Sequence, residues 1–257
     1  MLNGSIEEIK QYIEGLNTKE QYRLIPELLS DGRAGVRRIG KTLQGRLKKE
    51  AAELERINRM REIEKDLKKK GYRLVAGIDE AGRGPRAGPV VAAAAILPED
   101  FFLAGVDDSK KLSPRRREAL YQSIIDGSVA YGVGMVDSCE IDRINILQAT
   151  YRAVGIALEN LGQKPDCLLL DAMTLPGCSL YQQSVVKGDQ KCLSVAAASI
   201  IAKVTRDRFM EELHRRYPVY NFLQNKGYGT SEHVEAILRY GPCPYHRRTF
   251  IQNIRRR

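Results

Sequence analysis

The sequence predicts an α/β fold: a mixed central sheet flanked by helices, preceded by a helical N-terminal extension. Two observations support this fold class. Strand-like segments open the region of residues 71–257, and helix-like and strand-like segments then alternate, as expected for a mixed sheet with helices on its faces. Residues 1–70 instead carry apolar residues at helical spacing. We therefore expect a helical extension over 1–70 and a larger domain over 71–257 that ends in a helical segment.

The start of the extension contains two helix-start signals. Ser5 with Glu8, and Thr18 with Gln21, have the spacing of capping boxes, in which a side chain at each end of the first turn satisfies a backbone N–H. Two short helices should follow these positions. Residues 50–70 have the composition of a further, highly charged helix.

The middle of the extension is basic. From Arg33 to Lys49 there are seven basic residues and no acidic one. Gly35, Gly40 and Gly45 should weaken a helix here and would allow close approach to another surface. Two interpretations stay open: this stretch contacts phosphates and aids substrate binding, or it is a solvated basic face.

The larger region should contain five strands and several helices. Ser113-Pro114 and Ser138 have the residue types of helix starts. We expect strands over 72–78, 88–97, 129–136, 167–171 and 180–186, a long helix over 193–217 and a last helix over 231–240.

The composition narrows the class of protein. A formal net charge of +10 favours a polyanionic partner, nucleic acid before membrane. The five cysteines are widely spaced, and there is no C-x-x-C, so neither a zinc site nor a disulfide framework is expected. The longest apolar run, residues 90–97, is too short to span a bilayer, and we see no signal-peptide core. We expect a cytoplasmic monomer without membrane contact.

Carboxylates follow three of the predicted strands. Asp79 and Glu80 end the first, Asp171 ends the fourth, and Asp189 comes just after the fifth. Strand ends that meet at one edge would gather these acids, and only a cation would offset their repulsion. Oxygen ligands suit magnesium or manganese, and two such ions about 4 Å apart serve displacement at phosphorus. The alternative is that each acid caps a helix or pairs with a basic residue.

The glycine-rich loop after the first strand has two interpretations. Gly82, Gly84 and Gly88 resemble a dinucleotide-binding turn, which is a weak pattern when it stands alone. Pro85 and Pro89 interrupt the helix that such a turn requires. A loop whose backbone approaches a sugar-phosphate chain fits better, because glycine permits close contact and exposed N–H groups can bind phosphate oxygens.

Six motifs in one order resemble bacterial ribonuclease HII, the type 2 ribonuclease H family. The resemblance covers roughly residues 72–250 and implies a ribonuclease H-like fold. It implies a metal-dependent endonuclease that cuts the RNA strand of RNA–DNA hybrids and incises DNA duplexes 5′ to a single embedded ribonucleotide, leaving 5′-phosphate and 3′-hydroxyl ends. The motifs are Gly77-Ile-Asp-Glu-Ala-Gly-Arg-Gly-Pro85, Asp108-Ser-Lys-Lys-Leu112, Leu170-Asp-Ala172, Lys187-Gly-Asp189, Ala196-Ala-Ala-Ser-Ile-Ile-Ala-Lys-Val-Thr-Arg-Asp207 and Lys226-Gly-Tyr-Gly-Thr230.

The resemblance also assigns roles to residues. It implies that four acids bind two Mn²⁺ or Mg²⁺ ions and carry catalysis, and that the loop of Gly82, Arg83 and Gly84 senses the ribonucleotide together with Tyr228. For Tyr228 the alternative is a core tyrosine, which its flanking glycines disfavour. The four acids are Asp79, Glu80, Asp171 and Asp189.

Other basic residues are candidates for phosphate contacts. Lys110, Lys203 and Arg206 are in this group, although each could be a solvated surface charge. Lys203 and Asp207 are also spaced to pair along a helix. Arg86 departs from the family pattern, where an apolar residue is expected. The extension of residues 1–70 resembles that of longer family members of low-GC Gram-positive bacteria.

Two other functions remain to be weighed. A nucleic-acid-binding protein that has lost catalysis is disfavoured by the four intact acids. A DNA nuclease or resolvase on the same fold is disfavoured by the loop of residues 82–84 together with Tyr228.

Overall fold

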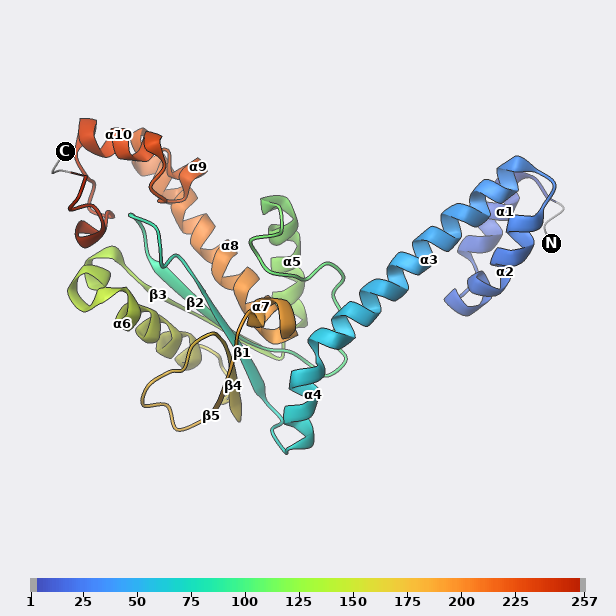
Figure 1. The fold of residues 1–257 in the computed structure, drawn as a ribbon, viewed down its shortest axis with the longest axis horizontal. Helices are drawn as coiled ribbons and strands as arrows, with labels where there is room; N and C mark the ends of the chain where they lie inside the picture. The colour runs from blue at the N-terminus through green and yellow to red at the C-terminus, as the bar shows by residue number, and fades with distance from the viewer. Residues whose placement is uncertain (1–3, 255–257) are drawn as a thin grey trace. The chain divides into compact units, whose positions relative to one another are not determined.

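The computed structural model describes residues 4–254, which form two compact units that divide after Asn58 (Figure 1). This contact-based division comes before residue 70, and the boundary that the sequence predicts there stays a prediction. Helix α4 (Glu62–Lys69) belongs to the larger unit, because Leu67 is buried in one hydrophobic cluster with Val75 and Cys167. A segment whose sequence reads as part of the extension is thus packed against the central sheet.

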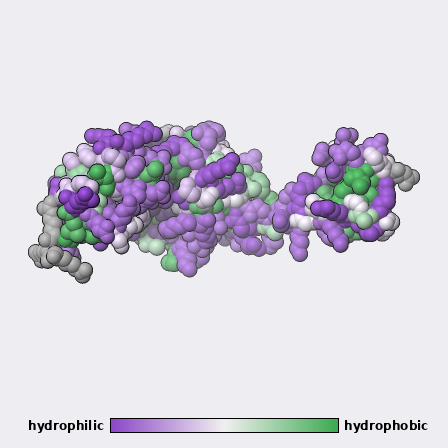
Figure 2. All heavy atoms as spheres, turned by 90° about the horizontal axis from the view of Figure 1, so that it is seen from above, coloured by the Kyte–Doolittle hydropathy of each residue, from purple (hydrophilic) through white to green (hydrophobic). Residues whose placement is uncertain are grey.

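The smaller unit is a helical assembly with its own core. It contains α1 (Ile6–Glu14), α2 (Thr18–Ser30) and most of α3 (Ala34–Met60). Apolar residues at helical spacing meet at its centre, including Ile9, Leu28, Val36, Leu43 and Leu47. Figure 2 shows hydrophobic side chains on part of this unit's surface, where a groove is lined by Ile6, Ile13, Ile39 and Leu43.

One of the two predicted capping boxes is confirmed and the other is shifted. The Ser5 hydroxyl accepts from the Glu8 N–H at 3.3 Å, and the Glu8 carboxylate accepts from the Ser5 N–H at 2.7 Å. The second box is formed by Asn17 and Glu20, at 3.0 and 2.9 Å, not by Thr18 and Gln21. Asparagine caps helices at least as well as threonine, so the cap lies one residue earlier.

The expected weakness of a helix around Gly35, Gly40 and Gly45 was wrong, because α3 continues through all three. A Cβ on Gly40 would lie 2.9 Å from Leu28 Cβ, and one on Gly35 would collide with Ile6. These two glycines therefore let α3 pack closely against its neighbours in the same unit. This packing outweighs their low helix propensity.

The larger unit contains the predicted mixed sheet, which has five strands within the described residues. Their order is β3-β2-β1-β4-β5. β1 pairs antiparallel with β2, which pairs antiparallel with β3, whereas β4 runs parallel to both β1 and β5. The strands are β1 (Val75–Ala81), β2 (Val90–Ile96), β3 (Ala130–Val136), β4 (Cys167–Asp171) and β5 (Tyr181–Val185).

Helices cover both faces of this sheet (Figure 1). On one face, α6 (Ser138–Glu159) packs on β1–β3, and Ala76 and Ile78 join its core cluster. On the other face lies α8 (Leu193–Arg216), with α5 (Pro114–Gly127) beside it. Because strand side chains alternate, Gly77 faces α8, and a Cβ there would collide with the backbone of Ser194.

The predicted helix at Ser138 is interrupted once. Asn145 has a positive φ of 69°, and its side chain accepts from the N–H groups of Leu147 and Gln148 at 3.0 and 3.1 Å. Asn145 thus caps the second half of α6, which explains the kink.

The C-terminal region folds over one end of α8. It contains α9 (Phe222–Asn225), α10 (Ser231–Tyr240) and two 3₁₀ turns, η1 (Pro218–Tyr220) and η2 (Arg248–Phe250). Its core includes Met210, Phe222 and Ile237. Within residues 4–254, no helix is both long and apolar enough to cross a bilayer.

Candidate active site

Asp79 and Glu80 lie within the central strand and do not follow it. The strand was predicted to end at residue 78, but β1 continues to Ala81, and the two acids are paired with Ala93 and Ala92 of β2. Asp79 is only 7% exposed. The small side chains of β2 leave the acids space that larger residues would fill.

The parallel pairing of β1 with β4 brings Asp171 to the same place. Ile78 pairs with Leu170, so the next residues, Asp79 and Asp171, lie side by side at the sheet centre. The Asp171 carboxylate accepts a 2.8 Å hydrogen bond from the N–H of Gly188. This contact draws the one-turn helix α7 (Gly188–Lys191), which carries Asp189, toward the strand ends. The structure therefore brings all four predicted acids to the same region of the central strands.

The electrostatics of this acidic cluster follow from burial and like charge. Burial, followed by the charge of Glu80, raises the pKa of Asp79 well above its ordinary value. Burial also raises the pKa of Glu80, although Arg83 opposes this shift. For Asp189, burial and then the neighbouring Asp108 raise the pKa to about 6. Each shift reflects the cost of holding several carboxylates together in a desolvated place.

This cluster fits a divalent cation. The Oε2 atom of Glu80 is buried and has no hydrogen-bond partner within the described residues, and a cation would satisfy it. Arg83 reaches only the other oxygen, at 3.3 Å, and its own side chain is half-exposed. The donor set is all oxygen, which suits hard cations. Within residues 4–254, however, no three His, Cys, Asp or Glu side chains are already gathered closely enough to hold an ion.

Lys110 lies beside the acidic cluster, as expected for a residue that could also meet a phosphate. Partial burial acts to lower the pKa of its ammonium group, but nearby carboxylates, Asp108 first and then Asp79, raise it overall. Its side chain is exposed. A solvent-accessible cation thus stands at the entrance to the acids.

Lys203 and Arg206 do not lie where free phosphate contacts would. Lys203 donates to Asp207 at 2.6 Å, which is the predicted helical pair. Arg206 is 1% exposed, and its guanidinium donates to the carbonyls of Pro89 and Ala87 at 3.0 and 3.1 Å. The expectation of a phosphate contact at Arg206 was therefore wrong. Its guanidinium instead binds backbone carbonyls inside the protein.

Arg247, which the sequence did not single out, performs the same task at the other half of the glycine loop. It is fully buried and donates to the carbonyls of Arg83 and Gly82 at 2.9 and 2.6 Å and of Gly88 at 3.0 Å. In a planar trans peptide, the N–H of the next residue points opposite to the carbonyl. The N–H groups of Arg83 and Gly84 therefore point away from Arg247.

Tyr228 stands next to this loop. A Cβ on Gly84 would lie 3.8 Å from Cε1 of Tyr228, which is an ordinary contact distance. The tyrosine is 48% exposed, so it is not the core tyrosine of the alternative interpretation. An exposed aromatic ring thus lies beside a loop in which two amides point away from the buried Arg247.

Asp108 and Ser199 also belong to the site, although they were not among the predicted site residues. Asp108 lies against Asp189, and Ser199 of α8 hydrogen-bonds to Asp79 and to the Ser109 hydroxyl, the latter at 2.8 Å. Asp108 and Ser109 fall in one of the recognised motifs, and Ser199 falls in another. The motifs were therefore a usable signal, but the residue pattern alone gave none for Arg247.

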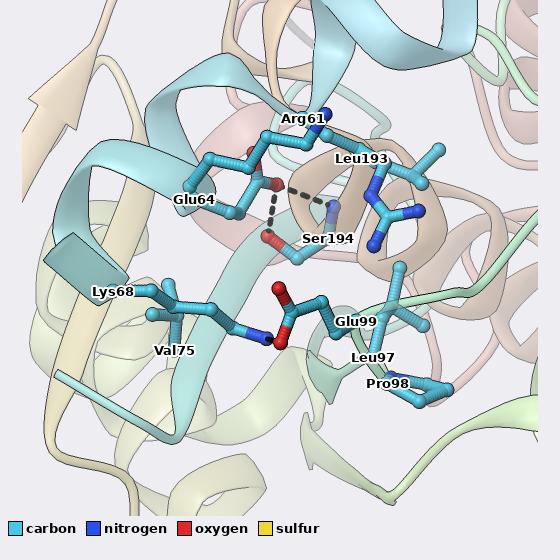
Figure 3. A pocket seen from close by; sticks show the side chains of 10 residues that line it. Arg61, Glu64, Lys68, Val75, Leu97, Pro98, Glu99, Leu193 and Ser194 are labelled. Atoms are coloured by element: carbon cyan, nitrogen blue, oxygen red, sulfur yellow. Dashed lines mark hydrogen bonds and ion pairs between the residues drawn. The ribbon is translucent and has the colours of Figure 1, made fainter.

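Helix α4 fixes the first turn of α8. Glu64 accepts from both the N–H and the hydroxyl of Ser194, at 3.0 and 2.9 Å, as Figure 3 shows. Around them is a small cavity lined also by Arg61, Lys68 and Glu99. Cys192 at the N-cap makes no side-chain cap. A carboxylate from a neighbouring helix supplies this cap instead.

A mixed sheet with four carboxylates gathered on and beside its central strands defines an α/β protein with an enzyme-like acidic site. The sequence profile of Ribonuclease HII matches residues 76–253, and that of the Ribonuclease HII N-terminal domain matches residues 5–68. The Ribonuclease HII of Acetivibrio thermocellus is 47% identical over 98% of this chain and 99% of its own length.

Solved structures agree with these matches. The ribonuclease H2 from Pyrococcus horikoshii has a TM-score of 0.58 and 34% identity, covering 72% of this chain and 100% of its own. The RNase HII in the PCNA:RNase HII complex from Archaeoglobus fulgidus has a TM-score of 0.60 and 27% identity, covering 72% and 98%. The chain belongs to the ribonuclease HII family. It is therefore a nuclease, and its fold is the ribonuclease H-like fold expected from the motifs.

Proposed function

We propose that this enzyme hydrolyses the RNA strand of RNA–DNA hybrids and also incises DNA duplexes on the 5′ side of a single ribonucleotide, leaving 5′-phosphate and 3′-hydroxyl ends. The observation that carries this proposal is the position of the glycine loop and Tyr228 on one surface, beside β1 with its acidic cluster. Family membership supports the choice of hybrid nucleic acid as substrate. The net charge of +10 suits a polyanion.

We further propose that the four acids hold two divalent ions, Mn²⁺ or Mg²⁺. Such ions, when bound, supply an activated water and stabilise the leaving oxygen. The protein's own part is to hold the carboxylates together at an energetic cost that a cation relieves. Ser199 keeps Asp79 oriented, and Lys110 provides positive charge for a phosphate at the entrance. The acids are Asp79, Glu80, Asp171 and Asp189.

Selectivity for the sugar would come from the loop and the tyrosine. Only the 2′-hydroxyl distinguishes a ribonucleotide from its deoxy neighbours. The outward N–H groups of Arg83 and Gly84 can contact the ribonucleotide at close range, because glycine carries no side chain that would hold it away. The ring of Tyr228 can pack against the sugar from the same side.

The N-terminal unit would aid substrate binding through fewer basic side chains than its composition suggests. Arg33 is bound to Asp31, and Arg37 donates to backbone carbonyls at the end of α2. Exposed basic residues remain along α3, namely Arg38, Lys41, Lys48 and Lys49.

All five cysteines are free thiols, which supports a reducing compartment such as the cytoplasm.

The test is cleavage of a labelled DNA duplex containing one ribonucleotide, run beside an all-DNA duplex and an RNA–DNA hybrid. Each reaction is performed with Mn²⁺, with Mg²⁺ and with a chelator. We expect metal-dependent cutting of the first and third substrates, a cut 5′ to the ribonucleotide, and an intact all-DNA duplex. Tight binding without a cut of either ribonucleotide-containing substrate would favour a binding protein and overturn the proposal.

A further inference from the structure

Two buried histidines form a hydrogen-bonded chain that ends on the backbone of Tyr228. The Nδ1 of His233, in α10, lies 2.8 Å from the Tyr228 carbonyl oxygen. Its Nε2 lies 3.0 Å from the Nε2 of His246. The Nδ1 of His246 in turn lies 3.0 Å from the N–H of Cys243. Both rings are at most 1% exposed.

This geometry fixes both tautomers. The Cys243 N–H can only donate, and the Cys243 thiol, with Sγ 3.1 Å from the same nitrogen, can also donate. The Nδ1 of His246 is therefore the acceptor, and the proton of this neutral ring sits on Nε2. That proton is donated to the Nε2 of His233, which leaves the His233 proton on Nδ1, where it meets the Tyr228 carbonyl. The chain therefore runs in one direction, from the Cys243 amide to Tyr228. Protonation of either ring would place two donors against each other.

The hydrogen-bonded chain ends at Tyr228, whose two neighbours in the sequence are glycines. Tyr228 lies between Gly227, with a φ of 86°, and Gly229. Its N–H donates to the Asn225 carbonyl at 2.8 Å, and its carbonyl also accepts from the Thr230 N–H at 2.9 Å. With His233 as the further donor, the peptide groups on both sides of Tyr228 are held. The backbone from which its half-exposed ring projects is thereby held before any ligand arrives.

The same C-terminal segment holds the glycine loop. Arg247 follows His246 directly, and its guanidinium binds the carbonyls of Gly82 and Arg83. The Arg247 N–H donates to the Arg86 carbonyl, and the Arg86 N–H donates to the Gly227 carbonyl, both at 2.8 Å. The tyrosine and the loop are thus joined through adjacent residues.

We propose that His233 and His246 are positioning residues for sugar selection: their fixed tautomers hold Tyr228 in register with the loop of residues 82–84. This inference deepens the proposed function and rests on it. Burial lowers the pKa of both imidazoles, that of His246 to about 4, which keeps the pair neutral.

The first test measures the tautomers directly by ¹⁵N NMR of histidine side chains at pH 7. We expect His233 to carry its proton on Nδ1 and His246 on Nε2, both neutral. His214, the third histidine of the sequence, is not part of this hydrogen-bonded chain, and His214→Ala removes its signals from the spectrum. Two rings of the same tautomer, or a charged ring, would overturn the proposal. This measurement is independent of cleavage.

The second test is a mutant cycle on the duplex with one ribonucleotide. His233→Ala should lower kcat/KM about tenfold, because the Tyr228 carbonyl loses one of its two donors and the tyrosine is held less firmly. His233→Asn places an amide nitrogen near Nδ1 and should recover most of this loss, and His214→Ala should behave as wild type. In a Tyr228→Ala background, His233→Ala should cost much less than it does alone, because it acts through that ring.

The outcomes separate the two proposals. Additive losses, or no recovery of activity in His233→Asn although its melting temperature returns to that of wild type, would overturn the positioning role. A wild-type protein that cuts neither ribonucleotide-containing substrate would overturn the proposed function and with it the role in sugar selection. The NMR pattern would then still establish or refute the hydrogen-bonded chain itself.

Discussion

Replacing Asp189 by asparagine should stabilise the metal-free protein at neutral pH. The carboxyl is 3% exposed, and burial, Asp108 and Asp171 raise its pKa from 3.8 to about 6. Ionising it in the folded state therefore costs about 3 kcal/mol relative to the unfolded chain. An amide of the same shape carries no charge and avoids most of this cost. For a unit of about 200 residues, this corresponds to a rise in Tm of at most about 6–12 °C.

The sign of the pH dependence follows from proton counting. Between pH 3.8 and about 6 the folded protein holds more protons at this group than the unfolded chain does. Stability of the metal-free wild type should therefore fall as pH rises through this window, and it should recover as pH is lowered again. In Asp189→Asn the fall should be shallower. Asp79 and Glu80, whose pKa values are also raised, keep part of the slope in both proteins.

The assay is thermal unfolding in chelator from pH 4 to 8, repeated with Mn²⁺. We expect the ion to raise the Tm of the wild type much more than that of Asp189→Asn, because the variant lacks the charge that the ion would neutralise. Glu99→Gln, which removes an exposed carboxylate that pairs with Lys68, serves as a control. A metal-free Asp189→Asn that is less stable than wild type at pH 7, or that has an unchanged pH slope, would refute this electrostatic account.

Four other variants probe the acids, the N-terminal segments and the glycine loop. Asp171→Asn should abolish cleavage while leaving duplex binding intact, and full activity in steady-state kinetics would contradict the metal assignment. Removing residues 1–58 should weaken substrate affinity more than turnover. Removing residues 1–70 should in addition lower the Tm, because it takes away Glu64 and Leu67. Equal Tm values for the two truncated proteins would disprove the structural role of α4. Arg206→Met should cost about 2–5 kcal/mol in urea unfolding, since three carbonyls lose their donor, and a change under 1 kcal/mol would show that the loop does not depend on it.

The sequence predicted the parts of the fold that local patterns encode. The strand over 167–171 has the bounds of β4, because a run of leucines ends in an acid there. The first strand was misplaced by several residues because acids are poor strand formers, and only the pairing of Asp79 and Glu80 with the alanines of β2 continues it. In α3, close packing at Gly40 outweighed helix propensity.

The sequence could indicate candidate site residues whose chemistry follows from their residue type. It could not indicate residues whose role depends on contacts with distant parts of the sequence. The four acids come together because their strands are neighbours, which the strand ends indicated. Arg206 and Arg247 bind carbonyls more than a hundred residues away, and no local pattern distinguishes such an arginine from one on the surface. A buried guanidinium satisfied by backbone alone is found only once the fold is known.

The contact of Gly77 with the start of α8 limits how the core of this protein can vary. Because the strand and the helix meet backbone to backbone, no exchange of core side chains can bring them closer or move them apart. Glu64 binds the same turn. The distance from Asp79 to Ser199 is therefore insensitive to most substitutions in the core. Substitutions in the N-terminal unit, which has its own core, are expected to leave the acids undisturbed.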